Sequence, residues 1–233
     1  MTHPPATRHD RRPRLSRDLV LQTAVAMADA NGIEAVSMRR LAQELGVEAM
    51  SLYHYFARKD DIVGGMLELV WAEVEPPLAG EEWRAALRKA AVSAYKALLR
   101  HPWATGVLGS SASVNSPRLH WMDSVLGTLR EAGFEPGTTD LAYHVLDSHI
   151  VGFVLWALPY LAIEKTNPNF ADEFLAEFPL AELPDLKAHV EYHLAPPPPT
   201  PGPSPFEFGL DLILDGLEDQ RIASAHVDEE VVV

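Results

Sequence analysis

Residues 37–56 read SMRRLAQELGVEAMSLYHYF, and this stretch decides the fold. Ser37 is a favourable N-cap for a short helix over residues 38–45, and Gly46 directly after it can adopt the positive φ that a tight turn needs. A second short helix is predicted over residues 49–56. Two helices packed across one another through a short turn with glycine form a helix-turn-helix, which presents its second helix to the major groove of DNA. The pattern therefore predicts a DNA-binding element.

The side chains of this element divide into an inward and an outward set. Small and apolar residues are predicted to pack between the helices: Leu41, Ala42, Leu45, Val47 and Leu52. Hydroxyls, an imidazole and aromatic edges remain outward, where they suit phosphate oxygens, base edges and thymine methyl groups. This outward set is Ala49, Met50, Ser51, Tyr53, His54 and Tyr55. Lys59 follows near the start of the next helix, where its ammonium and free backbone N–H groups can hold a phosphate together.

The rest of the chain is predicted to be helical, because apolar residues recur every three or four positions and strict alternation is nowhere sustained. Further helices are expected over residues 17–31, 60–75, 82–100, 118–132, 138–164 and 206–222, with weaker, proline-interrupted helix within 167–193. We therefore predict an all-α fold, in which a three-helix head with the helix-turn-helix is joined by a fourth helix to a helical bundle. The expected parts are a disordered basic arm (1–15), the DNA-binding head (16–75), a sensing and dimerisation domain (76–222) and a disordered acidic tail (223–233).

Charge is distributed unevenly along the 233 residues, whose net charge is −14. Residues 1–59 hold 9 Lys and Arg against 6 Asp and Glu, whereas residues 60–233 hold 10 against 27. An acidic surface repels phosphate, so DNA binding is expected only in the basic N-terminal part. The arginines of residues 8–14 are candidates for an additional electrostatic contact, although basic tails are also common without one.

Several classes of protein are disfavoured by what the sequence lacks. Cysteine is absent, which excludes disulfides, thiolate zinc sites and a cysteine nucleophile. The N-terminus has no apolar segment typical of a secretory signal, and the longest apolar run, residues 150–163, is too short to span a bilayer. We therefore expect a cytoplasmic protein without membrane contact. No nucleophile elbow, phosphate loop, metal cluster or histidine-anchored triad is recognisable, so we do not expect an enzyme.

The head resembles the tetracycline-repressor (TetR/AcrR) family of bacterial regulators. The resemblance rests on three short motifs: Arg39-Arg40-Leu41-Ala42, Gly46-Val47, and Leu52-Tyr53-His54-Tyr55-Phe56 followed by Lys59. It implies that DNA is contacted by Arg39, Ser51, Tyr53, Tyr55 and Lys59. It also implies that Ala49, Met50 and His54 stand at positions that vary with the operator sequence. A helical hairpin with exposed aromatic residues is the alternative without a DNA-binding role.

The body resembles the C-terminal domain of the tetracycline-repressor type. The matching segments are Glu82-Trp83, Leu99-Arg100-His101, Gly133-Phe134, Gly152-Phe153-Val154-Leu155 and FEFGLDLILDGLE at 206–218. The resemblance implies that the long helix over 138–164 and the last helix pack against the same helices of a second copy. These two helices are also the most apolar of the body, as the core of a dimer interface requires.

The tetracycline-binding pattern of that type is incomplete. His101 matches a histidine that holds the drug-bound metal, but Trp156 and Glu75 replace two other polar groups of the pattern, so no metal and no cofactor are expected. His101 either caps the carbonyls at the end of its helix or contacts a ligand. The predicted lining is mainly apolar and aromatic, which favours a large apolar or aromatic effector, although each residue also suits an ordinary core. The lining set is Met66, Leu69, Val70, His101, Trp103, Leu108, Trp121, Met122, Phe153 and Trp156.

Together these patterns predict a homodimeric, ligand-responsive repressor that binds a palindromic double-stranded operator and is released by a small molecule. The alternative is a helix-turn-helix regulator or activator that needs no effector. Two further histidine patterns stay open. His189 and His193 have the i, i+4 spacing of a metal pair but lack a third ligand, so a solvated helix face is the stronger interpretation. His144, Asp147 and His149 place polar groups on the long helix, where burial requires that at least one has a partner.

Overall fold

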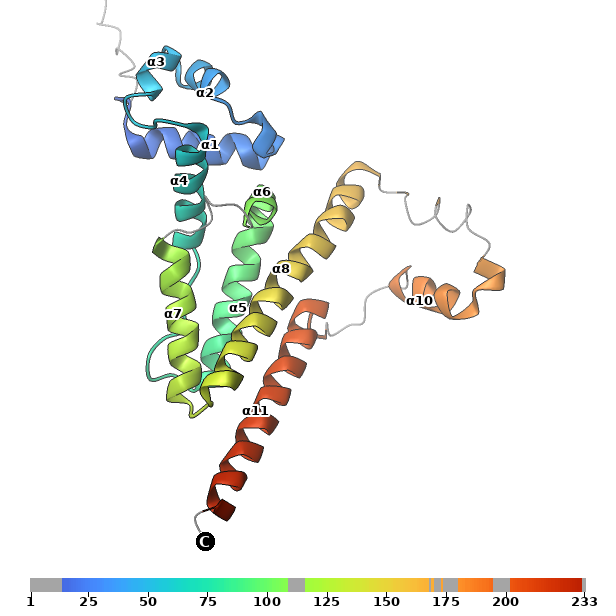
Figure 1. The fold of residues 1–233 in the computed structure, drawn as a ribbon. Helices are drawn as coiled ribbons and strands as arrows, with labels where there is room; N and C mark the ends of the chain where they lie inside the picture. Colours follow the sequence, from blue (N-terminus) through green and yellow to red (C-terminus); the bar gives the residue numbers. More distant parts are fainter. Residues whose placement is uncertain are drawn as a thin grey trace, which may run out of the picture.

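The computed structural model describes residues 14–108, 116–167, 169, 173, 180–194 and 202–231. Within these residues the elements are α-helices and short 3-10 turns, without a strand, which confirms the predicted all-α fold. The helix-turn-helix head occupies one end of the molecule and a bundle of longer helices forms the body (Figure 1). The predicted arm lies outside the described residues except for Arg14 and Leu15.

The head contains α1 (Arg17–Asn31), α2 (Met38–Leu45), α3 (Ala49–Leu52) and the first turns of α4 (Lys59–Ala72), with a 3-10 turn at Ile33–Ala35. The helix-turn-helix is set by local chemistry. The Ser37 hydroxyl accepts the Arg40 backbone N–H at 3.3 Å and thereby caps α2. Gly46 then adopts the left-handed conformation, with φ of 66°, and turns the chain toward α3.

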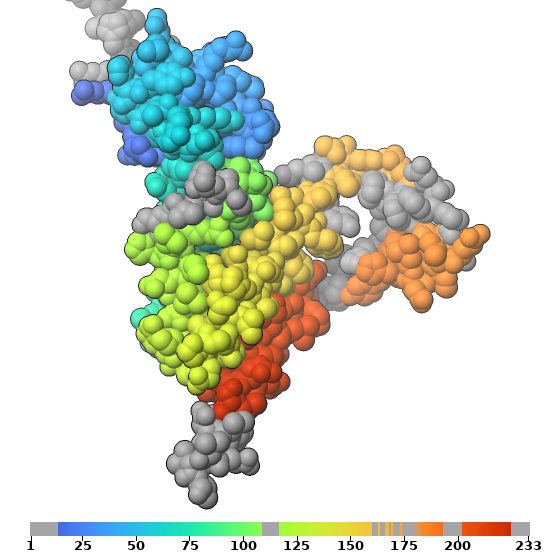
Figure 2. Space-filling view, in the orientation of Figure 1, coloured from blue at the N-terminus to red at the C-terminus, as the bar shows by residue number. Residues whose placement is uncertain are grey.

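The body contains α5 (Trp83–Arg100), α6 (Pro102–Val107), α7 (Ser116–Glu131), α8 (Pro136–Thr166), a 3-10 turn at Leu180–Glu182, α10 (Pro184–Leu194) and α11 (Pro205–Val231). α5 and α8 pack against each other at the centre, α7 covers both, and α11 packs along α8. Figure 2 shows α8 and α11 side by side on one face of the body, while α10 stands away from the bundle.

Three expectations about the helices are corrected. The third helix ends at Leu52 rather than at residue 56, because the Leu52 carbonyl accepts the N–H groups of Tyr55 and Phe56 in a tight turn. Pro102 does not only end a helix: it also begins α6, since proline is well suited to the first helical position, where its missing N–H has no intrahelical partner. The last helix continues through Val231, where a disordered tail from residue 223 was expected.

One hydrophobic core runs from the head into the body without interruption. α4 provides the continuity: Ile62 packs with the head, and the same helix carries the buried Met66 and Val70 into the bundle. Gly65 lies at the crossing with α1, where a side chain would collide with Leu21. A shift of α4 therefore moves contacts in both parts of the molecule.

α8 and α11 keep apolar faces that nothing in the described part of the chain covers. The exposed large apolar residues on these helices are Leu141, Val145, Leu155, Trp156, Phe208, Leu212 and Ile222. The segment Pro136–Pro159 of α8 is long and apolar enough, by length and composition alone, to cross a membrane, a property that the sequence analysis did not expect. An apolar helix that packs against another protein chain passes the same test.

Candidate DNA-binding and effector sites

The outward set of the helix-turn-helix lies on the surface above a closed core. Met50 is 68% exposed, and Tyr53 and His54 are exposed in the turn after α3. Leu52 between them is fully buried, as is nearly all of Phe56. This alternation supports the second helix from below and leaves its outer side open to a ligand as large as DNA.

The remaining residues predicted to contact DNA differ in accessibility. Arg39 on α2 is exposed, whereas Ser51 and Lys59 are half-buried and Ala49 packs partly against the core. Lys59 begins α4, but the side chain of Asp61 accepts the Arg58 backbone N–H at 2.9 Å. One of the N–H groups expected to hold a phosphate is therefore already used.

Tyr55 has a structural partner in addition to its predicted role. Its hydroxyl donates a hydrogen bond of 3.0 Å to the Leu15 carbonyl, just before α1. Nearby, the Arg17 guanidinium lies 4.7 Å from the centre of the Phe56 ring, a cation–π contact. These two contacts hold the start of α1, where the basic arm joins, against the end of the helix-turn-helix.

The predicted effector residues separate into two groups. Most lie in the interior where α4, α6 and α7 meet: Met66, Val70, Trp103, Leu108 and Trp121 are buried, with Leu69 and Met122 half-buried. Phe153 instead packs against His149 and Phe206 at the junction of α8 and α11. Trp156 is 56% exposed on the outer side of α8, and its position favours a role in the uncovered apolar face over the interior site.

The His101 ring does not cap helix carbonyls, which was one of its two predicted roles, and its contact with a ligand stays a prediction. Its Nδ1 lies 2.8 Å from Asp29 Oδ1 on α1, and its Nε2 lies 3.2 Å from Glu73 Oε1 at the end of α4. Because both neighbours are carboxylates, only the doubly protonated ring can donate from both nitrogens. His101 therefore links the head, α4 and the α5–α6 corner rather than capping helix carbonyls.

Two further side chains complete this junction cluster, defined as Asp29, Glu73, Arg100, His101 and Trp103. The Trp103 indole donates to Asp29 Oδ1 at 2.8 Å, and Arg100 donates to Glu73 Oε2 at 2.6 Å. Although burial opposes ionisation, the hydrogen bond from Arg100 and the charge of His101 lower the pKa of Glu73. The cluster is thus a charge-assisted bridge between head and body.

Sequence reasoning missed a second polar group inside the body. Arg118 on α7 pairs with Asp147 on α8 at 3.6 Å, and its guanidinium lies 5.4 Å from the centre of the Trp71 ring. Burial raises the pKa of Asp147 and, together with the Asp147 charge, that of Tyr143. Asp147 was noted as a polar residue on an apolar helix, but nothing local identifies Arg118 as its partner.

The neighbouring histidines have different environments. His144 is exposed and lies 3.7 Å from Asp140. The His149 Nε2 lies 2.9 Å from the Phe206 carbonyl, which confirms that at least one polar group of this helix has a partner. Among the described residues, no group of three acidic or histidine side chains could hold a metal. The His193 side chain lies outside the described part, so the pairing with His189 stays a prediction.

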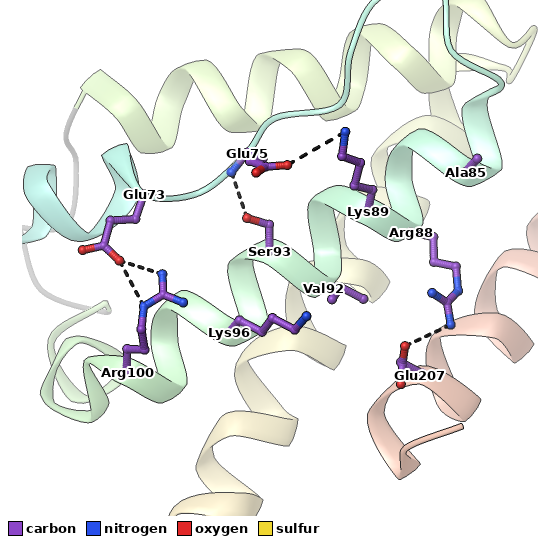
Figure 3. Close-up of a pocket in the computed structure, with 10 residues that line it drawn as sticks. All are labelled: Glu73, Glu75, Ala85, Arg88, Lys89, Val92, Ser93, Lys96, Arg100 and Glu207. Carbon is purple, nitrogen blue, oxygen red and sulfur yellow. Dashed lines mark hydrogen bonds and ion pairs between the residues drawn. The ribbon is translucent and has the colours of Figure 1, made fainter. Parts of the chain in front are cut away.

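A cavity of about 610 Å³ opens on the outer face of α5, away from the predicted effector residues. Its lining is largely charged, and Figure 3 shows many of these groups paired with one another, including Arg100 with Glu73 and Arg88 with Glu207. The Ser93 hydroxyl accepts the Glu75 backbone N–H at 2.9 Å. This surface cavity differs in chemistry from the apolar site that the sequence predicted.

Comparison with known proteins agrees with this architecture. The family model for tetR-family bacterial regulatory proteins matches residues 20–66, and the model for the tetracyclin repressor-like C-terminal domain matches residues 76–221. The HTH-type transcriptional repressor DrrR1 of Streptomyces coeruleorubidus is 34% identical over 212 residues, which cover 89% of this chain and 78% of the relative. The class E tetracycline repressor of Escherichia coli is 28% identical over 222 residues, covering 93% and 97% of the two chains.

A solved structure gives the same result for the fold. A possible TetR family transcriptional regulator from Streptomyces coelicolor A3(2) superposes with a TM-score of 0.72 at 28% identity, over 88% of this chain and 99% of that one. The matches cover both the head and the body, and they confirm the resemblance predicted from the sequence. The chain belongs to the tetR family of bacterial regulatory proteins.

Proposed function

We propose that the protein is a ligand-responsive transcriptional repressor that binds operator DNA through α2, α3 and the turn after α3. The observation that carries this proposal is the exposure of Met50, Tyr53 and His54 directly above the buried Leu52. The relatives named as repressors support the direction of regulation. Arg39, Ser51, Tyr53, Tyr55 and Lys59 hold the DNA, while Ala49, Met50 and His54 distinguish operator sequences.

Footprinting tests this function directly. The purified full-length protein is incubated with the DNA that flanks its own gene, and nuclease protection is mapped on both strands. We expect two protected half-sites related by a palindrome, with affinity that falls steeply as salt rises because phosphate contacts release counterions. Absence of any protected site at low salt would overturn the proposal.

A second copy of the chain is the partner expected at the uncovered faces of α8 and α11. Exposed apolar residues on both helices, such as Leu141 and Phe208, support a four-helix interface around a two-fold axis. Such a dimer would place two heads on successive half-sites, about 34–36 Å apart or somewhat more. We also expect a cytoplasmic protein, since the apolar face of α8 is explained by this interface without a membrane.

The effector is expected in the interior between α4, α6 and α7, where the lining is mainly apolar and aromatic. α4 and the junction cluster connect this interior to the head. A molecule that binds best when α4 has shifted would move the population away from the DNA-binding conformation. A coupling of about 3 kcal/mol is enough to weaken operator binding more than a hundredfold.

The coupling is measured by titrating operator DNA into the protein with and without a candidate effector. Compounds are first screened by the rise in unfolding temperature that they cause, because a ligand that binds only the folded state stabilises it. We expect unequal operator affinities for the free and the liganded protein. If every stabilising compound leaves operator affinity unchanged, the regulator acts without an effector.

A further inference from the structure

We propose that the effector is an aromatic molecule whose edge carries acceptor oxygen atoms, which the indole N–H groups of Trp71 and Trp121 bind beside Arg118. This inference rests on the effector site of the proposed function and names the chemistry that the site recognises. It adds oxygen acceptors to the expectation of a large apolar or aromatic effector.

Three buried side-chain polar atoms lack a hydrogen-bond partner within the described residues: Trp71 Nε1, Thr105 Oγ1 and Trp121 Nε1. Each of the two indoles is only 3% exposed. Most buried polar groups in folded proteins are paired, because an unpaired one loses its hydrogen bonds to water without replacement. The three atoms come from α4, α6 and α7, the helices that enclose the expected effector site.

Trp103 provides an internal comparison. It is about as buried as the other two indoles, yet its N–H donates to Asp29 at 2.8 Å. The fold therefore pairs the buried indole that holds the head to the body. Within the described residues, the two buried indoles left unpaired are Trp71 and Trp121, which lie against each other on α4 and α7, and this points to a ligand as their partner.

The unpaired indoles belong to one cluster of side chains. The Trp71 and Trp121 ring centres are 5.5 Å apart at an interplanar angle of 51°, and the Tyr143 ring lies 6.4 Å beyond Trp121. Arg118 lies 5.4 Å from the Trp71 ring and pairs with Asp147. Rings at this spacing contact each other directly, and together they form an aromatic surface against which a planar ring packs favourably.

Hydrogen-bond donors outnumber acceptors in the cluster formed by Trp71, Trp121, Tyr143, Arg118 and Asp147. An indole nitrogen and a guanidinium donate only, and the one carboxylate, Asp147, already faces Arg118. A hydrocarbon bound here would leave both indole N–H groups unpaired. An oxygen acceptor on the edge of the ring would satisfy them and would lie near the positive charge of Arg118, so the site discriminates in favour of oxygen-bearing rings.

Two probes of nearly equal shape test the proposal: 2-naphthoate, which carries two oxygen atoms, and 2-isopropylnaphthalene, which carries two methyl groups in their place. Their affinities for the full-length protein are measured by equilibrium dialysis. An apolar pocket would prefer the hydrocarbon, because burying an unpaired carboxylate is unfavourable. We expect naphthoate to bind about tenfold more tightly. Equal affinities, or tighter binding of the hydrocarbon, overturn the proposal.

Trp→Phe variants identify the donors, because phenylalanine keeps an aromatic ring and removes the N–H. Trp71→Phe and Trp121→Phe should each weaken naphthoate binding about tenfold and change binding of the hydrocarbon less than about twofold. Trp83→Phe is the matched control, since Trp83 packs edge-on against Phe134 outside the expected effector site, and it should change neither affinity appreciably. Equal losses for both probes in Trp71→Phe and Trp121→Phe would mean that the rings act by packing alone, which contradicts the proposal.

Operator binding by the unliganded wild-type protein is measured in parallel. If the protein binds its operator but prefers the hydrocarbon probe, this inference fails and the proposed function stands. If no operator is bound, the proposed function fails whichever probe is preferred. The wild-type comparison needs no variant, so misfolding of a Trp→Phe protein cannot hide the result.

Discussion

The head and the body use opposite arrangements of polar groups. In the head, the candidate contact residues lie within a span of about twenty residues and face outward over a small core that includes Leu52. In the body, the polar groups of interest are partly buried and come from different helices, as with Arg118 on α7 and Asp147 on α8. A surface that must meet DNA is built from consecutive residues, whereas an interior that must respond to a small molecule is built by tertiary packing.

The largest expected effect tests whether these two parts share one core. Leu52→Ala removes a fully buried side chain from the head and should lower the free energy of unfolding by about 2–5 kcal/mol. All five tryptophans lie outside α1–α3, so their fluorescence reports on α4 and the body. We expect the tryptophan transition of Leu52→Ala to move to lower denaturant concentration, although the substitution is in the head.

Met50→Ala is the control, two residues away and exposed. Its unfolding should change by less than about 0.5 kcal/mol because the side chain is exposed, while its operator affinity should fall if Met50 contacts the DNA as proposed. If Leu52→Ala abolishes operator binding and leaves the tryptophan transition at the wild-type midpoint, the head unfolds separately and the continuous core does not couple the two parts.

A substitution at Gly209 tests the packing of the body alone, because this glycine lies at the contact between α8 and α11. A Cβ on Gly209 would lie 2.7 Å from His149 Cε1, so Gly209→Ala forces the ring away from its hydrogen bond to the Phe206 carbonyl. We expect a loss of about 1–3 kcal/mol in unfolding free energy, together with weaker dimerisation by sedimentation. Gly216→Ala, on the same helix with no atom within 4 Å, should instead stabilise by up to about 1 kcal/mol. Equal effects of the two substitutions would contradict the close approach at Gly209.

The junction cluster tests the connection between the parts. Asp29→Ala leaves the N–H groups of His101 and Trp103 without their acceptor, and we expect a loss of about 1–3 kcal/mol. The distance between head and body should also become less defined, which spin labels on α1 and α7 would record as a broader distance distribution. Glu75→Ala removes an exposed carboxylate 3.9 Å from Lys89 and should change unfolding by less than about 1 kcal/mol. An unchanged distance distribution in Asp29→Ala would remove the cluster from the coupling.

The contrast between local contacts in the head and tertiary contacts in the body also explains which features the sequence could predict. Ser37 and Gly46 act on their own neighbours, so the limits of α2 and the outward direction of Met50 follow from local rules. α6 was missed because Pro102 indicates the end of one helix as readily as the start of the next. The partners of His101 and Arg118 could not be predicted, since residues of like charge recur throughout the chain and only tertiary packing selects Asp29 and Asp147.

The smallest expected effect compares the two carboxylates by pH. The pKa of Glu73 is lowered from 4.5, so its stabilising contribution is present above that value and is lost as pH falls through the lowered pKa. The pKa of Asp147 is raised from 3.8, mainly by burial, so the folded state favours the protonated carboxyl group. The resulting stabilisation of the folded state is fully present below pH 3.8 and is lost as pH rises through the raised pKa.

Isosteric amides separate these two effects. Glu73→Gln should be less stable than wild type at neutral pH. The loss in unfolding free energy should be less than about 1 kcal/mol, because the side chain is partly exposed. The difference from wild type should shrink as the pH is lowered toward 3. Asp147→Asn should show the opposite trend, with its stability relative to wild type improving as pH rises from 3 toward 7. Unfolding curves for the three proteins across this range give the signs directly. If the stability of both variants relative to wild type changed in the same direction with pH, Glu73 and Asp147 would have similar environments. The proposed difference between the junction and the interior of the body would then be wrong.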